Sequence, residues 1–330
     1  MTGIRSQWLE LTREAVLEPE LSLCDPHHHH WDYPSSRYLL EELVEDIGEH
    51  RVERTVFVEC GSMYSPGASE ALAPVGETRF VRDLAAQPAS AGHGLNSAIV
   101  GHANLLLGDA VDEVLAAHVA EGAGRFRGIR HSASWDPSDA IHASHSKPPP
   151  HMLLDADFRR GFARLRAHDL SFDAWCYHPQ IPELTDLAGA FPDTQIILDH
   201  VGGPLGIGPY AGKREEVFEA WRASITELSA RPNVVVKLGG LAMKICGFDF
   251  HRAAQPPGSE ELARITAPYY RHCIEVFGPD RCMFESNFPV DKVSASYTVV
   301  WNSFKRMTAQ YSDDERAALL RQTARRVYRI

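Results

Sequence analysis

The chain alternates between two kinds of apolar pattern. Short unbroken runs of β-branched and aromatic residues predict strands buried on both faces, and apolar residues three or four positions apart predict amphipathic helices. Strands are expected at residues 21–29, 55–60, 96–104, 126–131, 170–178, 195–201, 234–238 and 281–285. Helices are expected at residues 38–51, 77–87, 109–121, 157–168, 181–191, 217–230, 259–277, 292–310 and 312–329.

Eight strands alternating with helices in a chain of 330 residues indicate the α/β class. They favour a (β/α)8 TIM barrel over a doubly wound sheet. We expect one barrel domain over residues 21–330, with long loops after its strands, and an N-terminal helical extension over residues 1–20. No glycine-rich phosphate fingerprint follows a predicted strand, so nucleotide binding is not predicted. The loop 132–154 is long and carries apolar residues, which favours a lid that covers the substrate over a mobile surface loop.

Composition and charge narrow the class of partner. The chain is 44% hydrophobic and 23% charged, and 33 Lys and Arg against 44 Asp and Glu give a net charge of −11. An acidic chain without a basic cluster argues against nucleic acid or an anionic membrane as the main partner and leaves a small-molecule substrate. Six cysteines without a CxxC pair, no apolar signal segment and no membrane-length run favour a cytoplasmic protein. The oligomeric state stays open, a homo-oligomer included.

Four consecutive histidines, His27 to His30, follow the apolar start of the first predicted strand. Side chains alternate in direction along a strand, so His27 and His29 are expected on one face and His28 and His30 on the other. Two neutral imidazoles at a strand end can bind one metal ion, and they suit zinc, manganese or iron. A histidine-rich surface turn is the alternative interpretation of this stretch alone.

Polar residues gather at the carboxyl ends of the predicted strands, where the active site of such a barrel lies. These positions are His27, His29, Glu59, His102, Asn104, Arg130, His131, His178, His200, Lys237, Glu285 and Asn287. Six of these twelve are histidines, so we expect the set to form one site. A buried structural histidine is the alternative for His178 and His200, and Arg130 and Lys237 either bind a carboxylate or tie strands together. Alternation places Asp199 away from the face of His200.

The motif Asp25-x-His27-x-His29 and the segments 198–204 and 236–241 resemble the amidohydrolase superfamily, and more narrowly its amidohydrolase 2 branch. That branch contains sugar lactonases, pyrone-dicarboxylate hydrolases and metal-dependent aromatic acid decarboxylases. The resemblance covers residues 24 to about 304. It implies that His27, His29 and His178 hold one divalent metal ion, zinc by preference. It also implies that His200 hydrogen-bonds the metal-bound water or the substrate carbonyl.

One position departs from the pattern of that branch. Its members normally have an Asp after strand eight, in a Ser-Asp-x-Pro pattern, which binds metal or activates water. Here Asn287 stands between the matching Ser and Pro. An amide can bind a metal through its oxygen but does not take up a proton near pH 7. The base is then expected to be His200, Glu59 or Glu285, or a metal lowers the pKa of its bound water enough for a weak base to suffice.

The expected function is hydrolysis of a lactone or related cyclic ester of a small, carboxylated compound. Water activated by a metal or by histidine would attack the carbonyl carbon, with His200, Asn287 and Glu59 as catalytic groups. Substrate binding is expected from Arg130, His131, Lys237 and His102. Two alternatives stay open, a metal-dependent non-oxidative decarboxylase of an aromatic or unsaturated acid and a decayed barrel that only binds a ligand. A metal-free site, in which the histidines bind a substrate anion, is also open.

Overall fold

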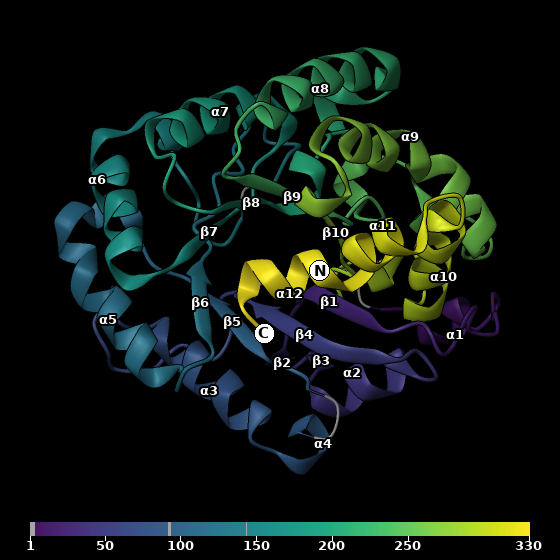
Figure 1. Cartoon of the computed structure of the whole chain (residues 1–330), viewed down its shortest axis with the longest axis horizontal. Helices are drawn as coiled ribbons and strands as arrows, with labels where there is room; N and C mark the ends of the chain where they lie inside the picture. The colour runs from purple at the N-terminus through teal and green to yellow at the C-terminus, as the bar shows by residue number, and fades with distance from the viewer. Residues whose placement is uncertain (1–3, 92–93, 143) are drawn as a thin grey trace.

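The computed structural model describes residues 4–91, 94–142 and 144–330. Eight parallel strands form one sheet in chain order, and helices surround it (Figure 1). The eight strands are β1 Leu23–His28, β4 Val52–Val58, β5 Ala98–Gly101, β6 Phe126–Ile129, β7 Ser171–Ala174, β8 Ile196–Leu198, β9 Val234–Leu238 and β10 Cys282–Phe284. An antiparallel hairpin, β2 Trp31–Tyr33 and β3 Ser36–Tyr38, follows β1. The predicted (β/α)8 TIM barrel is confirmed.

The helices follow the predicted apolar pattern closely. They are α1 Ser6–Leu9, α2 Leu40–Ile47, α3 Val75–Ala85, α4 Pro88–Ala91, α5 Val111–Glu121, α6 Ala156–Arg164, α7 Ile181–Ala190, α8 Arg214–Ser229, α9 Ser259–Phe277, α10 Tyr297–Thr308, α11 Asp313–Ala317 and α12 Thr323–Tyr328. A π-helical turn, Ala318–Gln322, joins α11 to α12. In the N-terminal extension, α1 is a single turn, and the Trp8 indole nitrogen donates a hydrogen bond to Ala253 O at 3.1 Å.

Side chains along each strand alternate between two apolar clusters. On β4, Val56 and Val58 point into the barrel, whereas Phe57 packs in the larger cluster between the sheet and the helices. The other interior strand residues include Cys24, Ala98, Val100, Ile197, Val235 and Met283. Burial on both faces is the reason why these strands form unbroken apolar runs in the sequence.

The first and last strands meet through the residues that follow β10. The Asn287 backbone N–H donates to His27 O at 3.0 Å, and the His29 N–H donates to Phe288 O at 2.8 Å. The buried Asp25 carboxylate accepts hydrogen bonds from the Ser286 N–H and hydroxyl at 3.0 and 2.6 Å. The hydrogen bonds of Asp25 and of the His27 and His29 backbone thus tie the barrel together and place the histidines beside the end of β10.

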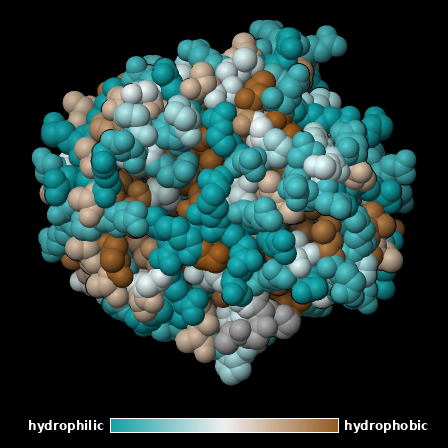
Figure 2. Space-filling view, in the orientation of Figure 1, coloured by the Kyte–Doolittle hydropathy of each residue, from teal (hydrophilic) through white to brown (hydrophobic). Residues whose placement is uncertain are grey.

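The amino-terminal opening of the barrel is covered by α12, which lies across it in Figure 1. The Tyr328 hydroxyl reaches into the barrel and donates to Asp173 Oδ2 at 2.6 Å. The face on which α12 lies is mostly hydrophilic, with hydrophobic residues in small separate groups (Figure 2). Within the described ranges, no helix combines the length and the apolar character needed to cross a membrane.

Candidate active site

The histidines after β1 divide between two sides of the sheet. The rings of His27 and His29 lie together, with 4.9 Å between centroids, and those of His28 and His30 lie together on the other side. His29 Nδ1 lies 2.8 Å from Val58 O, so Nδ1 carries the proton and Nε2 is the acceptor. Burial lowers the pKa of His27 and of His29, which keeps both rings neutral near pH 7. A neutral imidazole is the form that binds metal or accepts a proton.

Beneath His27 lies a buried network of charges inside the barrel. Lys237 Nζ lies 2.7 Å from Asp173 Oδ2, 3.0 Å from Asp199 Oδ1 and 3.1 Å from His27 Nδ1. Burial lowers the pKa of Lys237, but the Asp173 and Asp199 carboxylates outweigh it and hold that pKa above its ordinary value. Lys237 is 0% exposed, so it supports His27 from below and has no surface for the predicted substrate contact.

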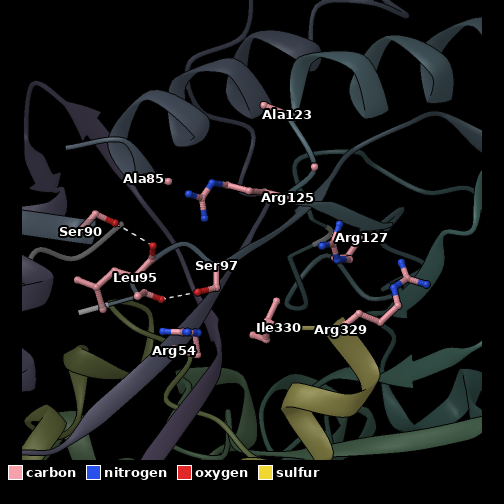
Figure 3. A pocket seen from close by; sticks show the side chains of 12 residues that line it. Arg54, Ala85, Ser90, Leu95, Ser97, Ala123, Arg125, Arg127, Arg329 and Ile330 are labelled. Carbon is pink, nitrogen blue, oxygen red and sulfur yellow. Dashed lines mark hydrogen bonds between the residues drawn. The ribbon is translucent and has the colours of Figure 1, made fainter. Parts of the chain in front are cut away.

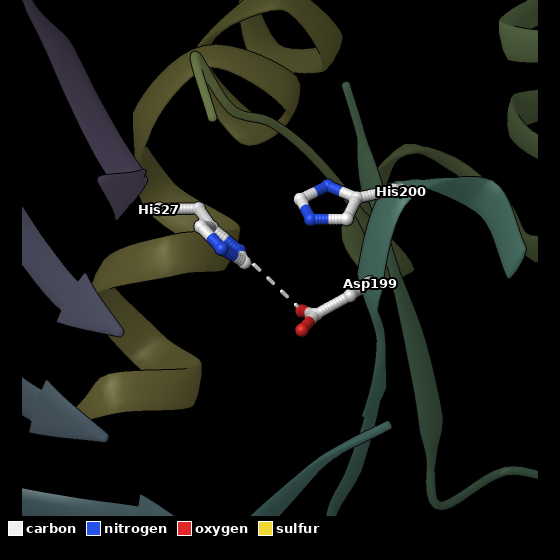
Figure 4. A group of neighbouring side chains, drawn as sticks. All are labelled: His27, Asp199 and His200. Atoms are coloured by element: carbon white, nitrogen blue, oxygen red, sulfur yellow. Dashed lines mark ion pairs between the residues drawn. The ribbon is translucent and has the colours of Figure 1, made fainter. Parts of the chain in front are cut away.

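Asp199 and His200 both point into the barrel, so the prediction that Asp199 points away is wrong. Strand β8 ends at Leu198, and His200 in the following turn has a φ of 53°. A left-handed residue changes the direction of the chain, so strand alternation no longer applies. Asp199 and His200 face His27 in Figure 4, with Asp199 Oδ1 3.6 Å from His27 Nδ1.

His200 forms a carboxylate–imidazole pair with Glu285. His200 Nδ1 lies 2.6 Å from Glu285 Oε1, and the His200 backbone N–H donates to the same oxygen at 3.2 Å. Glu285 Oε2 lies 2.9 Å from His27 Nδ1. Burial would raise the pKa of Glu285, but the His200 and His27 imidazoles hold it well below its ordinary value. The carboxylate is therefore ionised, and it orients His200 with Nε2 as the remaining acceptor.

The glycine pair after β9 makes room for this arrangement. A Cβ on Gly239 would lie 2.3 Å from Glu285 Cγ, and a Cβ on Gly240 would lie 2.5 Å from His200 Cβ. Gly240 also has a φ of 72°, which side chains rarely adopt. The pair therefore serves close packing at the site, in keeping with the absence of a predicted nucleotide fingerprint.

Arg130 and Glu59 form a second charged pair at the rim. Arg130 Nε donates to Glu59 Oε1 at 2.7 Å, and Nη2 donates to Glu59 O. Arg130 Nη1 lies 3.3 Å from His27 Nε2. Burial would raise the pKa of Glu59, but Arg130 and His145 hold it well below its ordinary value. His145 Nε2, from the loop 132–154, lies 3.1 Å from Glu59 Oε2, so this loop contributes to the site.

Asn287 presents its amide oxygen at the cavity wall. Its Nδ2 donates to Asp291 Oδ1 at 3.0 Å. Its Oδ1 is buried and has no hydrogen-bond partner among the described residues. This oxygen is available to a cation or to a substrate hydroxyl.

These side chains surround a cavity of about 400 Å³ at the carboxyl end of the barrel. The apolar part of its wall is Trp31, Tyr33, Cys60, Trp175, Met243 and Val290. The polar part is His29, Glu59, Arg130, Ser132, Ser144, His145, His200 and Asn287. The volume and the mixed wall suit a small-molecule substrate.

Three predicted histidines, His102, His131 and His178, lie neither in the wall of this cavity nor in the charged network beneath His27. His178 Nδ1 accepts a hydrogen bond from the Leu205 N–H at 3.3 Å, and His131 Nδ1 accepts one from the Leu105 N–H at 3.2 Å. His102 Nδ1 lies 3.1 Å from the Arg130 backbone carbonyl, but ligand atoms of His102, Glu59 and His145 lie within 4.8 Å of one another, so His102 borders the site. The backbone partners of His131 and His178 are typical of structural histidines, which was the alternative interpretation of histidines at the strand ends.

Sequence reasoning missed three residues of the site. Asp199 was not predicted to face the site because the apolar pattern does not reveal the left-handed turn after β8. Trp175 lies at the end of a predicted strand, but its contact with His200, 4.9 Å between ring centroids, depends on the fold. His145 lies in the loop predicted to be a lid, and its residue type was the available signal.

The donors assembled around His27 fit a divalent metal ion. Ligand atoms of His27, Asp199 and His200 lie within 4.8 Å of one another. Asp199 Oδ2 and Asn287 Oδ1 are buried without a hydrogen bond from the described residues, and Asp199 Oδ1 lies 3.0 Å from Lys237 Nζ. Imidazole nitrogens with such oxygens suit zinc, manganese or iron. His178, predicted as the third ligand, is not part of this group.

The amidohydrolase family model matches residues 24–330. The chain belongs to the amidohydrolase family. This amidohydrolase is 32% identical over 333 residues to the uncharacterized protein y4mH of Sinorhizobium fredii, covering 94% of this chain and 99% of y4mH. It is 29% identical over 313 residues to the L-fucono-1,5-lactonase of Burkholderia multivorans, covering 93% and 95% of the two chains. A B. multivorans amidohydrolase structure with bound zinc has a TM-score of 0.72 and 27% identity, covering 94% and 100% of the two chains.

Proposed function

We propose that this amidohydrolase opens a lactone or related cyclic ester by hydrolysis. The similarity to the B. multivorans lactonase supports this reaction class. The observation that carries the proposal is the His200–Glu285 pair at the cavity wall, with 2.6 Å between His200 Nδ1 and Glu285 Oε1. An imidazole oriented by an ionised carboxylate is a general base, and it replaces the base that Asn287 does not provide.

In the proposed reaction, His200 Nε2 takes a proton from water while the water oxygen attacks the lactone carbonyl carbon. Ionised Glu285 stabilises the imidazolium that forms, and Arg130 donates a hydrogen bond to the developing oxyanion. The ring C–O bond then breaks, and His200 returns the proton to the leaving alkoxide. The product is a hydroxy acid, so the reaction consumes one water and needs no other reactant.

His27 and Asp199, with the neighbouring His29, would hold a divalent metal ion, zinc by preference. A ring nitrogen of His200 also lies within 4.8 Å of ligand atoms of His27 and Asp199, but we assign His200 to proton transfer. When bound, such an ion polarises the carbonyl group and makes a nearby water more acidic. The neutral state of His27 and His29 and the buried oxygens of Asp199 support this assignment. Leaving His200 outside the ligand set keeps its Nε2 for the proton.

The cavity wall favours an uncharged, hydroxylated lactone. Arg130 is the one Arg or Lys in the described lining, and Glu59 neutralises it at 2.7 Å. The predicted carboxylated substrate therefore has no dedicated partner there. Trp31 and Trp175 offer flat apolar surfaces to a sugar ring, and the hydroxyls and amide in the wall offer hydrogen bonds.

The first experiment is a panel of 1,4- and 1,5-sugar lactones, with acid release and CO₂ release followed together. Wild-type protein should release acid without CO₂. His200→Asn should lower kcat by about 10²–10⁴-fold, the usual size of a general-base effect. His178→Asn is the matched control, because His178 lies outside the cavity wall, and it should stay within about threefold of wild type.

Three results would contradict the proposal. Release of CO₂ from an aromatic acid without acid release would favour the decarboxylase. A wild-type protein inactive on the whole panel would favour a ligand-binding barrel. Full activity in His200→Asn would remove His200 as the base.

A further inference from the structure

A second cavity, of about 530 Å³, lies at the amino-terminal end of the barrel. Its wall comes from the start of β4, the segment before β5, the turn between α5 and β6, and the residues after α12. Figure 3 shows the side chains of Arg54, Arg125 and Arg127 around the same space, with Arg329 at its edge. Four arginines from three separate parts of the sequence therefore share one cavity.

Three of these arginines have no carboxylate partner. Among the described residues, no Asp or Glu oxygen lies within 4.0 Å of a guanidinium nitrogen of Arg54, Arg125 or Arg127. Their hydrogen bonds go to backbone carbonyls, such as Arg127 Nε to Tyr328 O at 2.9 Å. Arg329 alone is paired, with Asp169 at 2.9 Å. The cavity thus carries an excess of positive charge.

The acidic residue that precedes Arg54 in the sequence is engaged elsewhere. Glu53 precedes Arg54, but its carboxylate accepts a hydrogen bond from Ser22 at 2.8 Å and lies 3.8 Å from Arg321 and 3.9 Å from Arg325. It therefore compensates the charge of α12 and of the turn before it. Arg54, Arg125 and Arg127 thus have no carboxylate partner among the described residues, in a chain whose net charge is −11.

This clustering has an electrostatic cost. Burial lowers the pKa of Arg127, and the charges of Arg329 and Arg125 lower it further, whereas Asp169 opposes them in part. Each guanidinium has five N–H donors, and Arg125 uses one of them, for a 3.5 Å contact with Asn96 O. Guanidinium groups of like charge that direct unused N–H donors into one space form a favourable binding site for an anion.

We propose that this cavity binds a small anion that carries phosphate groups. Planar guanidinium groups pair with phosphate oxygens through two parallel hydrogen bonds, and three of them match a ligand with two or more negative charges. A lone carboxylate would be satisfied by one arginine and would leave the other two uncompensated. The cavity volume leaves room for an organic group beside the phosphates.

Calorimetric titration of the full chain with inorganic pyrophosphate, at constant ionic strength, tests this site. Wild-type protein should bind, and Arg54→Gln with Arg125→Gln should weaken binding by more than tenfold. The matched control is Arg166→Gln with Arg222→Gln, which removes the same charge from two exposed arginines that are paired with Asp193 and Glu219. This control should bind within about twofold of wild type, because net charge alone has little effect at constant ionic strength.

A second arm compares pyrophosphate with ADP. Equal affinities identify the phosphates as the recognised group, and tighter binding of ADP shows that the organic group also fills the cavity. If the double variant does not fold, as judged by circular dichroism, Arg125→Gln alone should weaken binding more than threefold. Absence of binding to wild type, or an equal loss in the control variant, would overturn the proposal.

Discussion

The two ends of the barrel differ in whether their buried or half-buried cations have carboxylate partners. At the carboxyl end, Arg130 lies against Glu59, and Lys237 lies between two Asp carboxylates. At the amino-terminal end, Arg54 and Arg125 have no carboxylate within 4.0 Å among the described residues. Both ends carry cations, and they differ in how these are compensated.

Burial explains the difference. Lys237 is 0% exposed, and a buried charge is tolerated only when it is paired, because water does not solvate it. Arg54 and Arg125 are half-buried, so water solvates them in part and no partner is required. A paired cation positions its neighbours, whereas an unpaired cation near water can attract a ligand. We therefore expect the carboxyl end to recognise its substrate by shape and hydrogen bonds, and the amino-terminal end to recognise charge.

The largest effect is expected from removing the histidines of the carboxyl end. His27→Ala with His29→Ala should lower kcat by more than about 10³-fold and remove bound metal, because metal ligands and the support of the base are lost together. Turnover and elemental analysis of the purified protein measure this. His28→Gln with His30→Gln, on the other side of the sheet, is the control and should retain metal. Metal retained in the first variant, or lost equally in both, would show that the two faces were assigned wrongly.

The next effect concerns the stability of the two ends. Lys237→Met leaves two buried carboxylates without their cation and should lower the free energy of unfolding by about 3–5 kcal/mol. Arg125→Gln removes a cation without a carboxylate partner and should change it by less than about 0.5 kcal/mol. Denaturant unfolding at pH 7 compares them. Adding Asp173→Asn to Lys237→Met should recover part of the loss. Equal costs for the two single variants would refute the contrast between the ends.

The smallest effect concerns two buried carboxyl groups, Glu59 and Glu77, only the first of which is paired with an arginine among the described residues. Arg130 lies 2.7 Å from Glu59 and helps to hold its pKa below the ordinary value. Burial and the nearby Glu59 charge instead raise the pKa of Glu77 to about 8. Between its ordinary pKa and 8, the folded protein keeps a proton on Glu77 that the unfolded chain releases. Raising the pH therefore lowers the free energy of unfolding, by up to about 1.4 kcal/mol per pH unit.

Glu77→Gln should remove that contribution while keeping an oxygen for the N–H groups of Cys60 and Ser62. The difference in unfolding free energy between wild type and variant, measured from pH 5 to pH 8, isolates Glu77 from the other titrating groups. It should move in favour of the variant as the pH rises. A difference that does not change with pH would contradict the raised pKa.

Much of the fold was predictable from local pattern. The strand at 234–238 and the helix at 259–277 have the predicted bounds, because long apolar runs and strong helical periodicity mark them. The separation of His27 and His29 from their neighbours also followed from strand alternation. Where alternation ended, prediction failed, and the left-handed His200 reversed the expectation for Asp199.

The apolar pattern of the sequence did not predict which partners the polar residues would contact. His178 and Lys237 stand at strand ends like His200, and the apolar pattern does not distinguish them. His178 is hydrogen-bonded to the backbone, Lys237 is buried under the site, and His200 faces the cavity. Residues 54, 125 and 127 do not form a basic cluster in the sequence, yet they share a cavity.

By itself, the sequence determined the alternation of strands and helices, the barrel and the family, because these depend on periodicity and on motifs between close neighbours. The tertiary structure alone decided which charges meet. Glu285 lies 85 positions from His200 and Tyr328 lies 155 from Asp173, and both contacts depend on barrel closure and on α12. The chemistry of this protein rests on those distant pairs, because a buried charge is set by its neighbours in space and not by its neighbours along the chain.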